Sequence, residues 1–354
     1  MLCLGFVCTS CFDPAIDLSS SESANCYIVS EGGRYKFKAV KGNSSESVGE
    51  VASASVLWES FGTDIAPDVG DLIGKVSYKY GYIIFRTADT FKEGNAVIAA
   101  KDDDGNILWS WHIWLTDQPE GQVYYNNVGT MMDRNLGATS ATPGDVGALG
   151  LLYQWGRKDP FLGSSSISSD IEAESTITWP SSVCSDSSTG TIAYATAHPT
   201  TFITYNRSND DWYYTGSESI DNTRWTTSES TKSIYDPCPA GWRVPDGGRN
   251  GVWSKSLASS SSFGRYQYDS TNEGMNFSGK FGSASIIWYP ASGFRDYDDG
   301  SLYGVGGRGD YWSASPLMYG AYTLFFHYDF DHVSTSNYHF PAYGISVRCL
   351  QFID

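Results

Sequence analysis

The sequence has little charge and no cluster of basic side chains. Charged residues make up only 18% of the 354 residues, and 23 Lys and Arg stand against 40 Asp and Glu, which leaves a net charge of −17. Nucleic-acid binding depends on grouped Lys and Arg that displace counterions, and anionic membrane surfaces attract the same groups. The composition therefore argues against nucleic acid and against an anionic bilayer surface as partners.

The sequence also lacks the residue blocks of long helices. Runs rich in Ala, Glu, Lys, Leu and Arg are absent, whereas 37 Gly, 15% aromatic residues and frequent Ser and Thr runs are present. Such a composition is typical of β-rich, loop-rich extracellular proteins. At this length the chain can form two domains that each bury a core. No stretch after residue 11 is apolar over a length that would span a bilayer.

Catalytic and metal-binding patterns are missing as well. The chain shows no Ser-His-Asp order, no glycine-rich phosphate loop and no zinc-ligand spacing. We therefore expect no enzyme activity, no cofactor and no metal. The run Asp102–Asp104 before Gly105 lacks the distal acid of a calcium loop, and Asp-Gly between two β runs predicts a hairpin turn. We interpret His112, in the strand that follows, as structural.

The C-terminal segment from Asp310 to Cys349 contains neither Lys nor Glu, although surface loops ordinarily use both. It is rich in Tyr, Phe and His instead, and it holds three of the five His of the chain. Rigid aromatic rings with small polar partners are typical of binding surfaces. The alternative is a Tyr-rich outer strand of a stable β domain.

Two sets of residues alternate within this segment. Small or apolar residues in short strand-like runs form the expected framework, namely Trp312, Ser313, Ala314, Leu324, Phe326, Val333, Ile345, Val347 and Cys349. The large rings and imidazoles between them are expected to contact a ligand. The candidate ligand-binding residues are Leu317, Tyr319, Tyr322, Phe325, His327, Tyr328, Phe330, His332, Asn337, Tyr338, His339, Phe340 and Tyr343.

The N-terminus is apolar and short, and no basic residue precedes its apolar run. Thr9-Ser10-Cys11 resembles the end of a bacterial lipobox, in which Cys11 would become the lipidated first residue of the mature protein. We interpret residues 1–24 as a truncated signal or lipobox-like segment followed by a Ser-rich tether, Ser19–Ser23. This predicts a protein on the cell surface or outer membrane, attached to the membrane only through that anchor. The alternative is a start-site extension without function.

Residues 25–118 consist of short β runs separated by turn signals. Strict alternation places Trp109, Trp111, Ile113 and Leu115 on one face of the last run. Six or seven strands in a segment of this length predict an Ig-like β-sandwich.

From residue 119 onward the sequence carries several separated motifs. These are MMDRNLGA, LLYQWGRKDPF, DPCPAGWRVP, SGFRDYDDGSLYGVGG, YWSAS and SVRC. In this order they resemble the FISUMP family of bacterial surface proteins, which is related in fold to C-type lectin domains and to formylglycine-generating enzymes. The resemblance implies an α+β, C-type-lectin-like domain over residues 119–354. Ser313-Ala314 follow Trp312 where calcium-dependent lectins have Asn-Asp, so it does not imply a calcium site.

Residues 310–345 also resemble the variable region of proteins diversified by retroelements that replace template adenines. When an Asn codon of the AAY type is mutated at its adenines, it can encode Phe, Leu, Ser, Tyr, His, Pro, Thr, Asp, Gly or Val. Nearly all residues between 317 and 343 belong to the types that such a codon can reach, and Met318 is an exception. The resemblance implies a surface or pilus-tip adhesin that binds a protein or glycan ligand on another cell or host surface, and possible contact with other pilus subunits. A carbohydrate-binding lectin and a structural pilus subunit without ligand recognition are the alternatives.

Within that domain we expect a disulfide between Cys238 and Cys349, which would close a loop of 349 − 238 = 111 residues. Cys26 and Cys184 are expected to be free, buried thiols. Val252, Trp253 and Leu257 can share one face of a short helix. Residues 162–233 are expected to form a long insertion that is packed by its own aromatic residues and frames the binding face.

Overall fold

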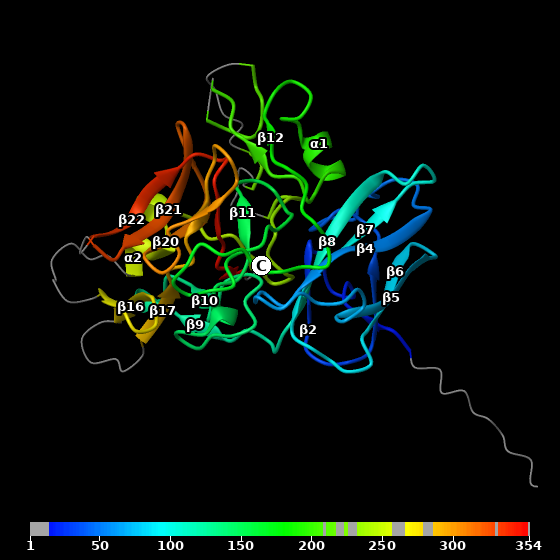
Figure 1. The fold of residues 1–354 in the computed structure, drawn as a ribbon, viewed down its shortest axis with the longest axis horizontal. Helices are drawn as coiled ribbons and strands as arrows, with labels where there is room; N and C mark the ends of the chain where they lie inside the picture. Colours follow the sequence, from blue (N-terminus) through cyan, green and yellow to red (C-terminus); the bar gives the residue numbers. More distant parts are fainter. Residues whose placement is uncertain are drawn as a thin grey trace, which may run out of the picture.

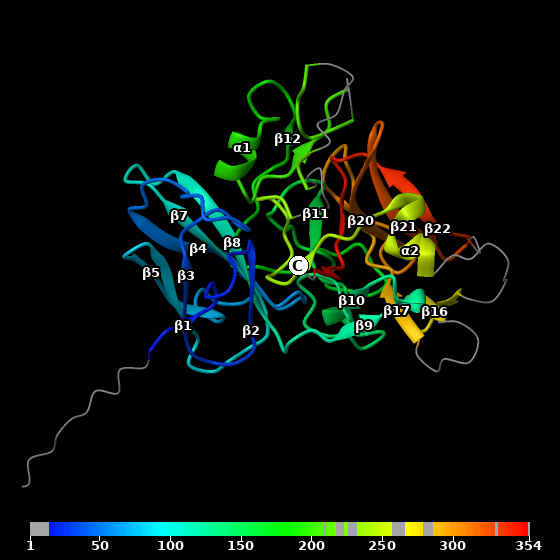
Figure 2. The same cartoon turned by 180° about the vertical axis from the view of Figure 1, so that it is seen from behind.

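The computed structural model describes residues 14–207, 210–216, 223–225, 232–256, 266–278, 286–329 and 332–352. Strands account for 39% of the residues and helices for 6%, so the chain is β-rich, as its composition predicts. Two units lie side by side in Figure 1 and in the reverse view of Figure 2. The first unit comprises residues 14–118 and the second unit the described residues from 119 onward. In the described part of the chain, no helix combines the length and the hydropathy that crossing a membrane requires.

The first unit is built from two four-stranded sheets, with strand orders β1-β3-β6-β5 and β2-β8-β7-β4. Its strands are β1 (Ile16–Asp17), β2 (Cys26–Val29), β3 (Arg34–Lys38), β4 (Ser53–Ser60), β5 (Ile73–Lys79), β6 (Tyr82–Thr87), β7 (Gly94–Lys101) and β8 (Ile107–Leu115). Alternating side chains from both sheets, Phe37 and Trp111 among them, share one core. The turn that contains Gly105 joins β7 to β8, which confirms the predicted hairpin.

From Trp109 to Leu115, strand β8 is buried on both of its faces. Trp109 and Trp111 point into the core between the two sheets. Trp114, on the opposite face, joins a second core that belongs mostly to the second unit, and its Nε1 donates to the carbonyl of Ala138 at 3.0 Å. His112 on that same face is only 2% exposed. The first unit therefore uses the outer face of this sheet as an interface.

The second unit contains several small sheets and short helices. Its strands are β9 (Gly121–Val123), β10 (Thr130–Met132), β11 (Leu152–Gln154), β12 (Val183–Cys184), β13 (Ile203–Thr204), β14 (Trp242–Arg243), β15 (Tyr266–Asp269), β16 (Gly274–Ser278), β17 (Ile286–Pro290), β18 (Phe294–Arg295), β19 (Leu302–Tyr303), β20 (Arg308–Leu317), β21 (Gly320–His327), β22 (His332–His339), β23 (Gly344–Ser346) and β24 (Leu350–Gln351). Its helices are α1 (Ile192–Ala197), α2 (Val252–Ser256) and the 3-10 turns η1 (Tyr125–Asn127), η2 (Val146–Ala148) and η3 (Gly248–Asn250).

The largest sheet of the second unit has seven strands, in the order β19-β18-β23-β20-β21-β22 with β11 paired to β23. Strands β20, β21 and β22 form an antiparallel meander at one side of this sheet (Figure 1). The smaller sheets are β14-β24-β10-β9, β15-β16-β17 and β12-β13. Helix α2 is the short helix predicted around Val252 and Trp253, both of which are buried, while Leu257 lies outside the described residues.

The two units share one continuous core. Trp58 and Trp114 of the first unit belong to the same buried cluster as Trp155, Trp225 and Trp312 of the second. An interface between domains that is this apolar behaves like a domain interior and not like a flexible joint. The aromatic residues of the 162–233 insertion contribute to this contact. They therefore pack against both units, and not only against one another as predicted.

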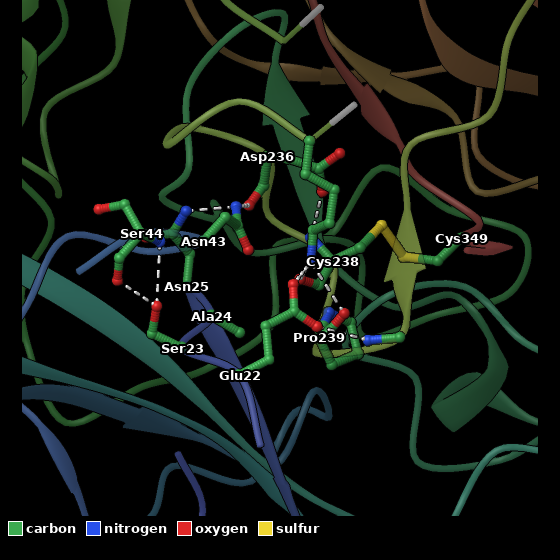
Figure 3. A network of polar contacts seen from close by, with 12 residues as sticks. Glu22, Ser23, Ala24, Asn25, Asn43, Ser44, Asp236, Cys238, Pro239 and Cys349 are labelled. Carbon is green, nitrogen blue, oxygen red and sulfur yellow. Dashed lines mark hydrogen bonds and ion pairs between the residues drawn. A yellow bond between two sulfur atoms is a disulfide. The ribbon is translucent and has the colours of Figure 1, made fainter. Parts of the chain in front are cut away.

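The N-terminal segment and the disulfide meet at the junction between the units, which Figure 3 shows. The side-chain amides of Asn25 and Asn43 donate to the carbonyl of Asp236 at 2.9 and 3.2 Å. Next to them, Cys238 and Cys349 form a disulfide with Cα atoms 6.0 Å apart. The first unit thus binds to the same loop that the disulfide ties to the C-terminal end of the chain.

Two expectations about this region differ from the structure. The segment interpreted as a tether is packed on the first unit, because β1 pairs with β3 and Ser19 is only 2% exposed. Cys26 is buried, but the prediction that Cys184 is buried is wrong, since its thiol is exposed. Cys184 ends β12, which pairs with the equally short β13, and this small sheet leaves the thiol at the surface. Cys11 lies outside the described residues.

Candidate functional site

The meander β20–β22 carries most of the residues that the sequence singles out. Its expected framework residues are buried, with the exception of the half-buried Val333: Trp312, Leu324 and Phe326 are each 0% exposed. Leu324 and Phe326 face a core shared with α2 and the β15-β16-β17 sheet. Trp312 faces the core that joins the two units, where its Nε1 donates to the carbonyl of Tyr153 at 2.7 Å. Each face of the meander therefore packs into a different core.

One group of candidate residues lies around the turn between β20 and β21. Tyr319 in this turn is 50% exposed, and Tyr338, on the neighbouring strand β22, is 49% exposed. Leu317 is half-buried at the end of β20. Tyr322 pairs with Tyr338 across the strands and lies against η3, where a Cβ added to Gly248 would come within 2.9 Å of its ring. We call Leu317, Tyr319, Tyr322 and Tyr338 the turn group.

A second group lies at the opposite end of β21. The rings of His327 and Tyr328 stack at 4.9 Å, and Tyr328 is 55% exposed. The eight residues of β21 separate this pair from Tyr319 by about 25 Å. Two other candidates cannot be placed with it, since Phe330 and the side chain of His332 lie outside the described residues. The sequence-predicted set therefore does not form one compact patch.

A third group lies on the face of the meander that carries Trp312, and here residues from distant segments come together. Tyr343 and Phe340, just after β22, contact Tyr297 with ring centroids 4.6 and 5.7 Å away. Tyr297 in turn contacts Tyr205 at 4.8 Å. Phe294 lies 5.5 Å from Tyr343 and 6.1 Å from Tyr303. We call these rings the ring cluster, which consists of Tyr205, Phe294, Tyr297, Tyr303, Phe340 and Tyr343.

A buried carboxylate lies next to the ring cluster. Asp310 is 0% exposed, and its two oxygens lie 2.6 Å from His339 Nε2 and 2.6 Å from Arg308 Nε. Asn337 Nδ2 lies 3.4 Å from the same His339 nitrogen. Burial by itself would raise the pKa of Asp310, but His339 and Arg308 together hold it below its ordinary value. Asp310 is therefore a charged group that fixes its neighbours in place.

His339 and Arg308 carry this fixed polar network into the ring cluster. The His339 ring lies 5.2 Å from that of Tyr343 and 6.5 Å from that of Phe325. The Arg308 guanidinium lies over the rings of Phe294 and Phe325, at 4.2 and 5.2 Å from their centroids. Among the candidates, Phe325, Asn337, His339, Phe340 and Tyr343 are thus the ones that meet at one place.

Carboxylates also approach the ring cluster from outside. Asp298 and Asp299 are exposed in the turn between β18 and β19, directly after Tyr297. Asp299 raises the pKa of Tyr303, and partial burial adds to the effect. Burial raises the pKa of Tyr297, and the nearby charge of Asp296 raises it further. The tyrosine hydroxyls therefore lie in a negative electrostatic potential.

The sequence did not single out the ring-cluster members that precede the C-terminal segment. Tyr205, Phe294, Tyr297 and Tyr303 lie far from Tyr343 along the chain. The available signal was the run RDYDDGSLY, which combines rings and carboxylates in a turn. This run is also part of the family motif SGFRDYDDGSLYGVGG. Tyr205 belongs to the 162–233 insertion, which was expected to frame the binding face and does place this ring beside Tyr297.

Another cluster of reactive groups is unsuited to catalysis. Lys158 Nζ donates to Ser110 Oγ and to Asp159, and Ser110 Oγ donates to Asp159 Oδ1 at 2.6 Å. Burial lowers the pKa of Lys158, although Asp159 opposes that shift. Ser110 is 1%, Lys158 3% and Asp159 4% exposed. A substrate cannot reach this serine, so the cluster holds the two units together.

Within the described residues, no group of His, Cys, Asp and Glu side chains has the arrangement of a metal site. The ring cluster thus combines rings held by their neighbours with a fixed polar network at one edge. No protein family, no curated protein and no solved structure matches this chain.

Proposed function

We propose that this chain is a cell-surface or pilus-tip adhesin that binds its ligand through the ring cluster. In this proposal the first unit is an Ig-like sandwich, and the second is a C-type-lectin-like domain of the FISUMP type. The observation that carries the proposal is the convergence of six rings from separate segments, five of which are at least partly exposed, while the sixth, Phe294, is buried in the core.

Rings that are already held in place make good contacts with a ligand. Tyr297 touches three other rings, so binding costs little additional side-chain entropy. Rings of this kind, with a polar group beside them, often dominate binding energy and can each contribute about 2 kcal/mol or more. The more exposed turn group, which includes Tyr319 and Tyr338, lies apart from the ring cluster and is not part of this contact.

The shared core between the units gives the first unit a role in this proposal. Trp58 and Trp114 tie the first unit rigidly to the ligand-binding unit. A rigid support transmits force from an anchored end to the bound ligand without a hinge. A lipid anchor at Cys11 would supply that anchored end.

The test compares binding of the labelled full chain and of a Tyr297→Ser, Tyr303→Ser variant to a panel of intact bacterial and epithelial cells by flow cytometry. Both residues lie in or beside an exposed turn, so the variant should unfold within a few degrees of the parent. We expect the variant to lose binding, and Tyr80→Ser, on the first unit, to retain it. Tyr80 is 87% exposed and far from the ring cluster. Retained binding by the ring variant would refute the proposal.

Two treatments of the cells separate the ligand classes. Protease treatment should abolish binding to a protein ligand, and glycosidase treatment should abolish binding to a glycan. Binding that a chelator removes would favour a calcium-dependent lectin instead. Incorporation into a filament that survives the ring substitutions would favour a purely structural subunit. In related chains from the same locus, diversification predicts that substitutions are confined to residues 316–343.

A further inference from the structure

We infer that the ring cluster docks a protein segment that carries Lys or Arg side chains. The inference rests on the proposed function and adds the chemistry of the ligand to it. The argument is charge complementarity: aromatic faces are surrounded by carboxylates, and the basic groups next to them already have acidic partners.

Five carboxylates act electrostatically on the tyrosines of the ring cluster, namely Asp170, Asp210, Asp296, Asp298 and Asp299. They come from the 162–233 insertion and from the turn between β18 and β19. Three of them, Asp170, Asp298 and Asp299, are exposed. A ligand that approaches the rings therefore meets negative charge on more than one side.

The basic groups at this place do not offset that charge. Arg308 lies against Asp310 with 2.6 Å between Nε and Oδ2. Arg295 is 8% exposed and pairs with Glu172 at 2.8 Å. Each of these two cations is paired with its own carboxylate, so the net charge at the surface of the ring cluster remains negative. The net charge of −17 on the whole chain adds long-range attraction for a basic partner.

The electron-rich faces of Tyr and Phe attract guanidinium and ammonium groups, and nearby carboxylates strengthen the preference. The protein itself uses this contact at the edge of the ring cluster, where Arg308 lies 4.2 Å from the centroid of Phe294. An anionic ligand would be repelled by the surrounding Asp residues. A neutral sugar could stack on the rings but would gain little from the carboxylate charge.

The test measures binding of the full chain to immobilised Gly/Ser peptides in which alternate residues are Arg, Gln or Glu. We expect the Arg peptide to bind and the other two not to. Its affinity should fall about tenfold or more between about 50 and 500 mM NaCl, because exposed charges are screened. Tyr297→Ser should weaken binding of the Arg peptide, since that variant removes a central ring of the cluster.

Two charge variants with the same change in net charge provide the matched comparison. Asp298→Asn with Asp299→Asn should weaken binding of the Arg peptide roughly fivefold, and Asn keeps an acceptor oxygen for the turn. Asp103→Asn with Asp104→Asn, in the hairpin between β7 and β8, should leave it unchanged. The inference is overturned if the Arg peptide does not bind, if the Gln or Glu peptide binds equally well, or if the two variants behave alike. The proposed function would survive that outcome if Tyr297→Ser, Tyr303→Ser still abolishes binding to cells.

Discussion

His339 and Asp310 are in contact across the whole width of the meander, with 2.6 Å between Nε2 of His339 and Oδ1 of Asp310. They lie on β22 and β20, whose backbones are about 10 Å apart because β21 runs between them. On β21, His339 pairs with Ala321 and Asp310 pairs with Phe325, so the contact runs diagonally across the meander. This contact locks the edge strand to the inner strand at the border of the ring cluster.

Replacement of Asp310 by Asn should destabilise the protein and change its response to acid. The lowered pKa of Asp310 means that its carboxylate stabilises the folded state above the unfolded pKa, near 3.8, and that this stabilisation is lost as the pH falls through the folded value. At pH 7 we expect a loss of about 2–3 kcal/mol in urea unfolding. Between about pH 5 and 3 the parent should lose more stability than the variant. Equal slopes for the two proteins would contradict this.

The buried and exposed rings of the meander should differ sharply in their effect on stability. Trp312→Ala should cost about 3–5 kcal/mol, since the indole is fully buried and its removal leaves a cavity in the core that both units share. Tyr338→Ser should change the free energy of unfolding by less than about 1 kcal/mol, because the ring is 49% exposed. Thermal and urea unfolding measure both, and a large loss on Tyr338→Ser would show that this ring belongs to the framework.

The disulfide should make a large contribution to stability. A Cys238→Ser, Cys349→Ser variant removes a cross-link that spans 111 residues, and in the chain-entropy model such a loop contributes about 4–5 kcal/mol. Cys184→Ser is the matched control, because that thiol is exposed and unbonded to another cysteine. Peptide mapping should also find Cys184 alkylated in the native protein and Cys26 only after unfolding. A disulfide variant as stable as the parent would contradict the prediction.

The buried Lys158–Asp159 pair should couple the stability of the two units. Lys158→Met leaves Asp159 buried and uncompensated, which should cost about 3–5 kcal/mol. The double variant with Asp159→Asn should recover part of that loss, since no buried charge remains. Because the core is shared, scanning calorimetry should show one cooperative transition for the parent and for both variants. Two separate transitions in the parent would mean that the units unfold independently.

Much of the local structure could be predicted from the sequence. The six or seven strands predicted within residues 25–118 correspond to strands β2 to β8. Tyr80 and Gly81 have positive φ values of 51° and 80°, which form the tight turn between β5 and β6. The β-rich class and the buried framework of the meander, including Trp312, were predictable for the same reason: alternation along a strand is a local property.

The composition of the candidate site could be predicted only in part. The sequence singled out His339, Phe340 and Tyr343 but placed them with Tyr319 and Tyr328, which lie in other groups. The side on which a ring lies depends on strand register and on the irregular pairing between β21 and β22. Neither is visible in a list of residue types.

The sequence alone determined that this protein is β-rich, where most strands of its first unit lie, and that framework residues of the C-terminal segment such as Trp312 are buried, because these properties follow from composition and from the two-residue period of a strand. Only the tertiary structure decided that Tyr205 and Tyr297 join Tyr343 in one cluster, and that the outer face of β8 is covered by the second unit. Contacts between segments far apart in the chain depend on how complete sheets pack, and no local pattern encodes that.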